Sequence, residues 1–297
     1  MNAIQKIERK QLKGIGQIPV CKITDWENQI DKYYNIGVQE ILKGKLALVL
    51  LAGGQGTRLG LDGPKGTLNV GITKKLYLFE LLIKNTLKVV EKIGCLIPFF
   101  IMTSELNDIE TRAFFETHDY FGYNPNYIRF FIQESNVVTD LAGEPLYKAP
   151  GERMTSPNGN GGWFSSLYNS NIVKDSLFNR VEWINVFSVD NVLQGIADPV
   201  FLGATINSGD ICGAKVIKKS YPEERVGAIC TLNGKPYIIE YYELDELKKD
   251  NPALDMCMFN YGVTLNYLFR VSELEKTLNV DMPLHKVKKN VKRYYKN

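Results

Sequence analysis

The stretch LALVLLAGGQGTRLGLDGPKGT, residues 46–67, decides which fold the sequence predicts. Its first six residues are apolar, a pattern typical of a buried strand in a parallel sheet. The run ends at a glycine-rich segment that also carries Thr57, Arg58 and Lys65. Glycines let an anion approach backbone N–H groups closely, and the two cations supply the charge that a phosphate needs. The stretch therefore predicts a phosphate-binding loop directly after a strand.

This loop matches neither of the two commonest phosphate-binding motifs. A Walker loop requires a Gly-Lys-Ser/Thr sequence, whereas Lys65 follows Pro64. The dinucleotide motif GxGxxG fits Gly54 and Gly56 but meets Leu59 where the third glycine belongs. The sequence thus supports neither a P-loop NTPase nor a Rossmann dehydrogenase.

The segment that ends at Lys65 resembles the signature L-x-x-G-G-x-G-T-R-L-G-x-x-x-P-K of the nucleotide-sugar pyrophosphorylases. The version with Gln55 is most similar to the eukaryotic UDP-N-acetylglucosamine pyrophosphorylases and their UDP-sugar relatives. The alternative is a glycine-rich turn without a ligand. The resemblance implies that Arg58 and Lys65 are catalytic. It also implies that the nucleotide contacts Leu51, Ala52, Gly53, Gly54, Gly56 and Thr57.

Composition places the 297-residue chain among ordinary globular proteins. A net charge of +3 is too small to argue for nucleic acid. The five cysteines are scattered and the two histidines lie far apart, which favours neither a disulfide framework nor a zinc site. No signal-peptide pattern and no membrane-length apolar run is present, so we expect a cytoplasmic protein without a membrane partner.

Helical and strand patterns alternate along the first two thirds of the chain. The spacing predicts helices over 26–42, 77–93 and 105–118, and strands over 96–102, 126–133 and 181–189. This order implies parallel strands with right-handed crossovers. We therefore expect an α/β fold: a Rossmann-like mixed, mainly parallel sheet flanked by helices.

Two strand ends and a second glycine-rich loop add candidate residues. Gln133 and Asp190 end predicted strands, and ligands collect at the carboxyl ends of parallel strands. By resemblance Gln133 contacts the uracil. The loop over 156–163 resembles the family's P-x-G-N-G-G loop, which implies that Gly159 binds the nucleotide and Asn160 the sugar. Alone, such a loop is better explained as a turn; the presence of the first loop favours a binding role. Asp190 is the candidate Mg²⁺ ligand, and its alternative is an Asx-turn residue.

The segment over 211–242 alternates β-branched runs with turns, and Asn233-Gly234 predicts a hairpin, so antiparallel strands are expected. The resemblance implies a sugar pocket lined by Gly227, Glu240 and Tyr241, although Glu240 could be a solvated carboxylate. Val263 stands where the family's F-N-x-G-N-x-x-N element has an asparagine. This departure leaves N-acetylglucosamine, glucose and galactose 1-phosphates as candidate substrates.

The expected organisation is an N-terminal helical segment over 1–45 and a nucleotidyltransferase catalytic domain over 46–297, without the family's C-terminal domain. The final segment, 285–297, is rich in lysine and arginine. It is read either as a solvated tail or as a patch that gathers phosphates.

The resemblance implies a magnesium-dependent transfer of uridylyl from UTP to N-acetylglucosamine 1-phosphate by a monomer or weak homo-oligomer. The alternatives are a UTP–glucose-1-phosphate or broad UDP-sugar pyrophosphorylase and a non-catalytic UDP-sugar-binding protein. Nucleic-acid binding through the basic tail is the third and least favoured.

Overall fold

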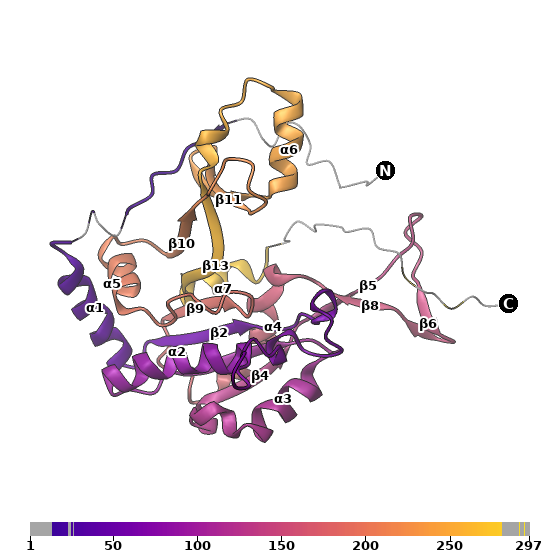
Figure 1. Cartoon of the computed structure of the whole chain (residues 1–297), viewed down its shortest axis with the longest axis horizontal. Coiled ribbons are helices and arrows are strands. Elements are labelled where there is room, and N and C mark those ends of the chain that lie inside the picture. Colours follow the sequence, from indigo (N-terminus) through magenta and orange to yellow (C-terminus); the bar gives the residue numbers. More distant parts are fainter. Residues whose placement is uncertain (1–13, 23–24, 26, 281–290, 292–293, 295–297) are drawn as a thin grey trace. The chain divides into compact units, whose positions relative to one another are not determined.

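A computed structural model describes residues 14–22, 25, 27–280, 291 and 294 of the chain (Figure 1). These residues form two compact units. The larger unit contains Asp31–Cys212 and residues 268–280, and the smaller unit contains the described residues before 31 together with Gly213–Tyr267. The basic segment over 285–290 lies outside the described residues, as does Trp26 at the start of the first predicted helix.

A parallel sheet forms the centre of the larger unit. Its strands are β2 (Leu46–Leu51), β3 (Phe99–Thr103), β4 (Ile128–Ile132) and β9 (Trp183–Ser188), in the order β9-β2-β3-β4. All residues of β2, β3 and β9 are buried. Each β2 residue has a parallel partner on β9, and residues 48–51 also have one on β3. The predicted α/β fold with mainly parallel strands is confirmed.

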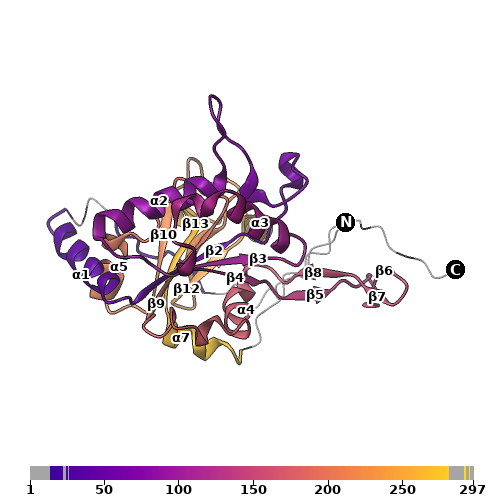
Figure 2. The same ribbon diagram turned by 90° about the horizontal axis from the view of Figure 1, so that it is seen from below.

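Helices cover both faces of this sheet, as Figure 2 shows for α2 and α3 on one side and α4 and α7 on the other. The helices of the larger unit are α1 (Ile30–Leu42), α2 (Leu78–Ile93), α3 (Asp108–Thr117), α4 (Trp163–Asn169), α5 (Pro199–Asn207) and α7 (Val271–Thr277). Leu46, Leu48 and Leu50 pack into one core cluster with Phe79 and Leu82 of α2. The period-2 alternation of β2 gives the other three residues to the opposite face.

The third predicted helix begins three residues later than its sequence pattern indicates. The carbonyl of Ser104 accepts hydrogen bonds from the N–H groups of Asn107 (3.0 Å) and Asp108 (2.9 Å), and this turn takes up the residues predicted as helix from Glu105. The helix α3 therefore starts at Asp108, with Asn107 as the preceding residue.

A hairpin arm that the sequence patterns did not predict follows β4. It consists of β5 (Ser135–Val137) paired with β8 (Thr155–Pro157), and β6 (Tyr147–Ala149) paired with β7 (Glu152–Arg153). Figures 1 and 2 both show the arm projecting from the sheet beyond β4. The arm returns the chain to the second glycine-rich loop, which begins where β8 ends.

Antiparallel strands build the smaller unit, as expected. Its elements are β1 (Ile15–Gly16), β10 (Cys212–Lys218), β11 (Ala228–Leu232), β12 (Lys235–Ile239), α6 (Tyr241–Asp250) and most of β13 (Tyr261–Arg270). The predicted Asn233-Gly234 turn joins β11 to β12. Both turn residues have positive φ, 52° and 76°, which is the backbone that two-residue hairpins require.

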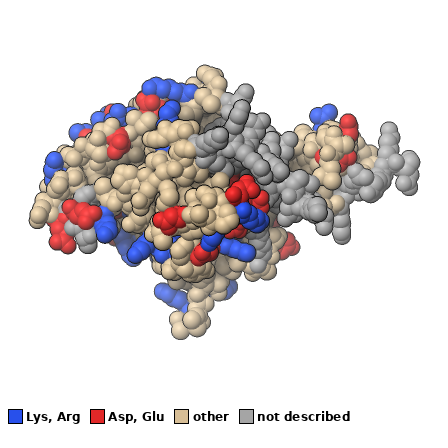
Figure 3. Space-filling view, turned by 90° about the horizontal axis from the view of Figure 1, so that it is seen from above, with Lys and Arg blue, Asp and Glu red and all other residues tan. Residues whose placement is uncertain are grey.

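Short 3-10 turns complete the description: η3 (Thr57–Leu59), η4 (Lys65–Thr67), η5 (Asp119–Gly122), η6 (Pro125–Tyr127), η7 (Asn160–Gly162), η8 (Ile172–Lys174) and η9 (Met256–Phe259). Within the described ranges, no helix has both the length and the apolar character needed to cross a membrane. On the face seen in Figure 3, acidic and basic side chains are intermixed and form no broad field of one sign.

Candidate functional site

The first glycine-rich loop leaves the carboxyl end of β2 and closes on itself. The N–H of Gly56 donates to the carbonyl of Gly63 (2.9 Å), and the N–H of Lys65 donates to the carbonyl of Gly54 (3.2 Å). These two bonds bring Lys65 back beside the start of the loop, although ten residues of sequence lie between Gly54 and Lys65. The predicted phosphate loop and its lysine thus form one local structure.

Gly53 marks the place where this loop passes the end of β4. A Cβ atom on Gly53 would lie 2.7 Å from Oε1 of Gln133, a separation that real Cβ atoms essentially never show. A Cβ on Gly54 would meet nothing within 4 Å. A Cβ at position 53 would therefore force the buried Gln133 carboxamide to move, whereas Gly54 borders open space.

Gln133 also connects β4 to the second glycine-rich loop. Its side chain is buried, and its Nε2 donates a hydrogen bond of 2.6 Å to the carbonyl of Gly159. Gly159 has a φ of 90°, a conformation that only glycine adopts without strain. One carboxamide thus lies against the first loop at Gly53 and bonds the second loop at Gly159.

Glu134 also contacts the second loop and the helix that follows it, although no sequence pattern selected this residue. Its carboxylate accepts hydrogen bonds from Asn169 Nδ2 (2.7 Å) and Ser165 Oγ (3.3 Å) of α4. Its carbonyl accepts from the N–H of Asn158 (3.0 Å). Asn160, predicted to contact the sugar, is exposed at the start of η7.

The predicted catalytic lysine and the predicted metal ligand form an ion pair. Lys65 Nζ lies 2.6 Å from Asp190 Oδ1, with side-chain exposures of 28% and 57%. The alternative interpretation of Asp190 as an Asx-turn residue is not what the structure shows, because the turn is made by Asn191, whose Oδ1 accepts from the N–H of Leu193 (3.2 Å). Asp190 instead points its carboxylate at the first loop.

The half-exposed carboxylate of Asp190 fits a Mg²⁺ ion that takes only one or two ligands from the protein. Mg²⁺ in nucleotide sites takes one or two protein carboxylates and completes its shell with water and phosphate oxygens. Within the part of the chain that the structure describes, no group of three or more His, Cys, Asp or Glu residues gathers. Asp190 therefore fits a metal ion that binds together with a phosphate ligand. The described residues contain no site in which protein side chains alone would surround a metal ion.

Arg58, the second predicted catalytic cation, belongs to η3. Its side chain lies outside what the structure describes, so its role stays a prediction. The backbone of η3 ends at Gly60, whose φ of 74° is the left-handed conformation typical of a helix end.

Three of the residues predicted to contact the sugar region lie together in the smaller unit. A Cβ on Gly227 would lie 3.3 Å from Val263 Cγ2 and 3.5 Å from Glu240 Oε2. The N–H of Val263 donates to the carbonyl of Gly227 (2.9 Å). Glu240 immediately precedes α6, and its N–H donates to the carboxylate of Glu243 (2.9 Å). Tyr241 begins the helix and is 37% exposed.

Burial and charge act on a phenol close to this group. Burial, together with the smaller effect of the negative charge of Glu240, raises the pKa of Tyr267 to about 12. The Tyr267 hydroxyl therefore remains protonated at neutral pH, where it can donate as well as accept a hydrogen bond.

Residues 2–297 match a protein family described as UTP--glucose-1-phosphate uridylyltransferase. The match spans nearly the whole sequence. The chain belongs to this uridylyltransferase family. The predicted resemblance to UDP-sugar pyrophosphorylases is thereby confirmed.

Two curated relatives of the chain are named as UDP-N-acetylglucosamine enzymes. The UDP-N-acetylglucosamine pyrophosphorylase of Saccharomyces cerevisiae is 35% identical over 272 residues, which cover 89% of this chain and 57% of the relative. The UDP-N-acetylglucosamine diphosphorylase 1 of Arabidopsis thaliana is 32% identical over 317 residues, covering 97% of this chain and 63% of the relative. The chain thus spans little more than half the length of these relatives.

A solved structure of the family has the same fold. The uridine diphosphate N-acetylglucosamine pyrophosphorylase from Trypanosoma brucei, solved in complex with an inhibitor, superposes with a TM-score of 0.74 at 28% identity. The alignment covers 87% of this chain and 54% of that one. The nucleotidyltransferase-type α/β fold is shared.

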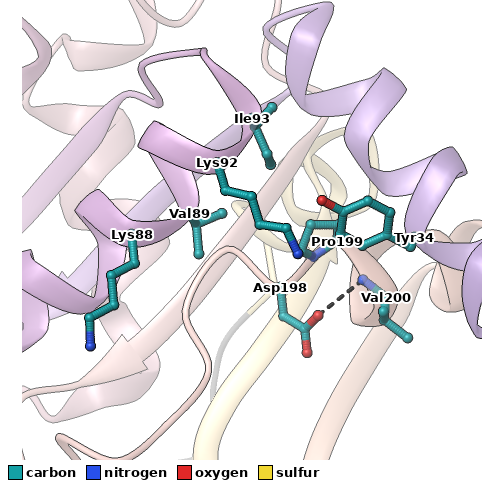
Figure 4. A pocket seen from close by; sticks show the side chains of 8 residues that line it. All are labelled: Tyr34, Lys88, Val89, Lys92, Ile93, Asp198, Pro199 and Val200. Atoms are coloured by element: carbon teal, nitrogen blue, oxygen red, sulfur yellow. Dashed lines mark hydrogen bonds between the residues drawn. The ribbon is translucent and has the colours of Figure 1, made fainter.

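A cavity of about 360 Å³ lies apart from the predicted site residues (Figure 4). Its walls come from α1, the last turns of α2 and the start of α5: Tyr34, Lys88, Val89, Lys92, Ile93, Asp198, Pro199 and Val200. Lys92 Nζ lies 4.8 Å from the centre of the Tyr34 ring, and Asp198 Oδ1 accepts from the N–H of Val200 (3.0 Å). None of the predicted site residues lines it, and the C-terminal turns of α2 lie far along the helix from the first loop.

Proposed function

We propose that this chain transfers uridylyl from UTP to N-acetylglucosamine 1-phosphate and releases pyrophosphate. The observation that carries the proposal is the position of Gln133, which lies against the first glycine-rich loop at Gly53 and bonds the second at Gly159. One residue suited to a pyrimidine base thus joins the predicted phosphate loop to the loop predicted to bind the nucleotide and the sugar. We infer the identity of the sugar from the relatives, which are named for UDP-N-acetylglucosamine.

The chemistry needs no nucleophile from the protein. A phosphate oxygen of the sugar 1-phosphate attacks the α-phosphorus of UTP, a new P–O bond forms, and the bond from the α-phosphorus to the bridging oxygen breaks as pyrophosphate leaves. Two polyanions must be aligned and their charge neutralised. We assign stabilisation of the α-phosphate to Lys65 and of the leaving pyrophosphate to Arg58, with the amides over 53–57 holding the remaining phosphate oxygens.

A phosphate that binds Lys65 must compete with Asp190 for the lysine's charge. Because the lysine is paired with Asp190 at 2.6 Å, its charge is already partly compensated before a nucleotide binds. A phosphate oxygen must therefore displace the carboxylate. We propose that Asp190 then holds Mg²⁺, which would neutralise phosphate charge when bound.

Recognition of the sugar is assigned to Asn160, Gly227, Glu240 and Tyr241. The Val263 side chain beside Gly227 has no group that can hydrogen-bond a sugar, and this favours glucose or galactose 1-phosphate as second candidates. The cytoplasmic location and the monomeric or weakly oligomeric state stay predictions.

The test measures pyrophosphate release from UTP and Mg²⁺ with N-acetylglucosamine, glucose and galactose 1-phosphates offered separately. Release with the first sugar supports the proposal, and release with another replaces the substrate. UTP binding without release from any of the three would contradict catalysis and favour a UDP-sugar-binding protein. The control variant is Lys84→Ala, which removes an α2 lysine paired with Glu80; neither residue is among the predicted site residues.

A further inference from the structure

Asn107 contacts the phosphate loop, although neither its sequence context nor the proposed chemistry selects it. It precedes α3 and is 1% exposed. Its Nδ2 donates to the carbonyls of Ala52 (2.9 Å) and Gly54 (3.3 Å), and its Oδ1 accepts from the N–H of Ser104 (2.8 Å). Both donors of the carboxamide are thus directed to the first loop across more than fifty residues of sequence.

An asparagine at the start of a helix ordinarily serves the helix itself. Its side-chain oxygen accepts from the N–H groups of the first turn. Asn107 makes no such bond with α3. The carboxamide therefore has a different task, and its partners lie in the loop.

The two carbonyls that Asn107 holds determine where two N–H groups point. A trans peptide directs its C=O and N–H in opposite directions, and none of the described peptide bonds is cis. The Ala52 carbonyl shares a peptide unit with the N–H of Gly53, and the Gly54 carbonyl shares one with the N–H of Gln55. Because Asn107 binds both carbonyls, both N–H groups are turned away from α3.

These N–H groups are left without a hydrogen-bond acceptor in the part of the protein that the structure describes. Among the described residues, none accepts a hydrogen bond from the N–H of Gly53, Gly54 or Gln55. Consecutive unpaired N–H groups of this kind form a cavity for an anion. The Gly54 carbonyl that Asn107 holds also accepts from the N–H of Lys65 (3.2 Å), so the same bond network positions the lysine.

We propose that Asn107 is a positioning residue for the triphosphate: it orients the Gly53 and Gln55 amides toward the phosphates and fixes the backbone of Lys65. This inference rests on the proposed use of UTP. It assigns Asn107 no contact with the ligand. Its loss should therefore weaken interactions with phosphate and leave those with the base intact, because Gln133 and Gly159 keep their own bond.

The test compares wild type, Asn107→Ala and Asn107→Asp by calorimetric titration with UTP and with uridine. Losing two hydrogen bonds should weaken UTP binding by roughly tenfold or more, with uridine affinity unchanged and kcat reduced more than KM is raised. Asn107→Asp should behave similarly, because an oxygen then faces the two carbonyls. The matched control is Asn124→Ala, which removes an asparagine that does cap its turn, by accepting from the N–H of Asn126 (3.0 Å).

A second measurement needs no variant. In the wild type, hydrogen exchange at the Gly53 and Gln55 amides should slow when UTP is added and not when uridine is added. Equal loss of UTP and uridine affinity in the variants, or amides that UTP does not protect, would overturn the positioning role and leave Asn107 as a structural residue. A wild type that binds UTP but releases no pyrophosphate would contradict the proposed function alone. A wild type that binds no UTP would contradict both.

Discussion

Lys65 Nζ and Asp190 Oδ1 lie 2.6 Å apart, so the predicted catalytic cation and the predicted metal ligand form an ion pair. The lysine belongs to the first loop and the aspartate follows β9. The strands that carry them, β2 and β9, are direct neighbours in register over all six residues of β2. This strand pairing brings the two side chains together, so a change in the charge of one alters the electrostatic environment of the other.

Replacing Lys65 should separate catalysis from folding. Lys65→Ala removes the cation proposed for the α-phosphate, and losing one such contact typically costs about 10²–10³ in rate. Stability should change by no more than about 1 kcal/mol, since the pair is partly exposed. Turnover and thermal unfolding measure the two effects. Turnover close to wild type would remove Lys65 from the mechanism, and Lys84→Ala should leave both quantities unchanged.

Replacing Asp190 should have opposite effects with and without divalent metal. Asp190→Asn removes a negative charge that competes with the phosphates for Lys65. UTP should therefore bind more tightly than to wild type when a chelator is present, while turnover with Mg²⁺ should fall. Calorimetry in chelator and a magnesium titration of the rate check the two halves. Weaker UTP binding in chelator would show that the ion pair does not oppose the nucleotide.

Two adjacent glycines should differ sharply in their tolerance of a methyl group. Gly53→Ala places Cβ 2.7 Å from Gln133 Oε1, and such crowding typically costs about 1–3 kcal/mol. Gly54→Ala meets open space, so stability should change by no more than about 0.5 kcal/mol. Chemical denaturation of the pair measures the difference. Equal stabilities would show that the Gln133 carboxamide moves aside for the added methyl group without cost. A loss of UTP affinity in Gly54→Ala would then reflect contact between the methyl group and the nucleotide.

Tyr123 should make stability sensitive to alkaline pH. Its buried hydroxyl donates to the Ile97 carbonyl (2.6 Å) and accepts from the Ile97 N–H (3.3 Å). Burial raises the pKa of this phenol above its ordinary value. The neutral phenol therefore contributes fully below the unfolded pKa of about 10, and the contribution is lost as pH rises toward the folded pKa.

Tyr123→Phe should accordingly be less stable than wild type by about 1–3 kcal/mol near pH 8, because the Ile97 groups lose their partner. The difference should shrink above about pH 10. Denaturation at both values tests this, with the exposed Tyr168→Phe as control. A difference that is constant with pH would show that Tyr123 does not titrate with folding.

Local sequence patterns determined the type of those elements that were predicted and the nature of the two glycine-rich loops. The apolar run of β2, the two glycine-rich loops and the Asn233-Gly234 turn all depend on backbone preferences within a few residues, and these preferences hold whatever the rest of the chain does. The sequence also predicted that the candidate residues lie at the carboxyl ends of parallel strands, because alternating strands and helices allow few topologies.

The tertiary structure decided which side chains meet. Lys65 reaches Asp190 because β9 is the neighbour of β2, and Asn107 reaches Ala52 because β3 is the neighbour on the other side. The hairpin arm after β4 was likewise missed, because its ladders are only two or three residues long. Strand order brings together residues that are 55 to 125 positions apart, and no local preference encodes it. The sequence by itself therefore predicts a nucleotide loop and its cations, and the packing of β2 between β3 and β9 determines how they are held.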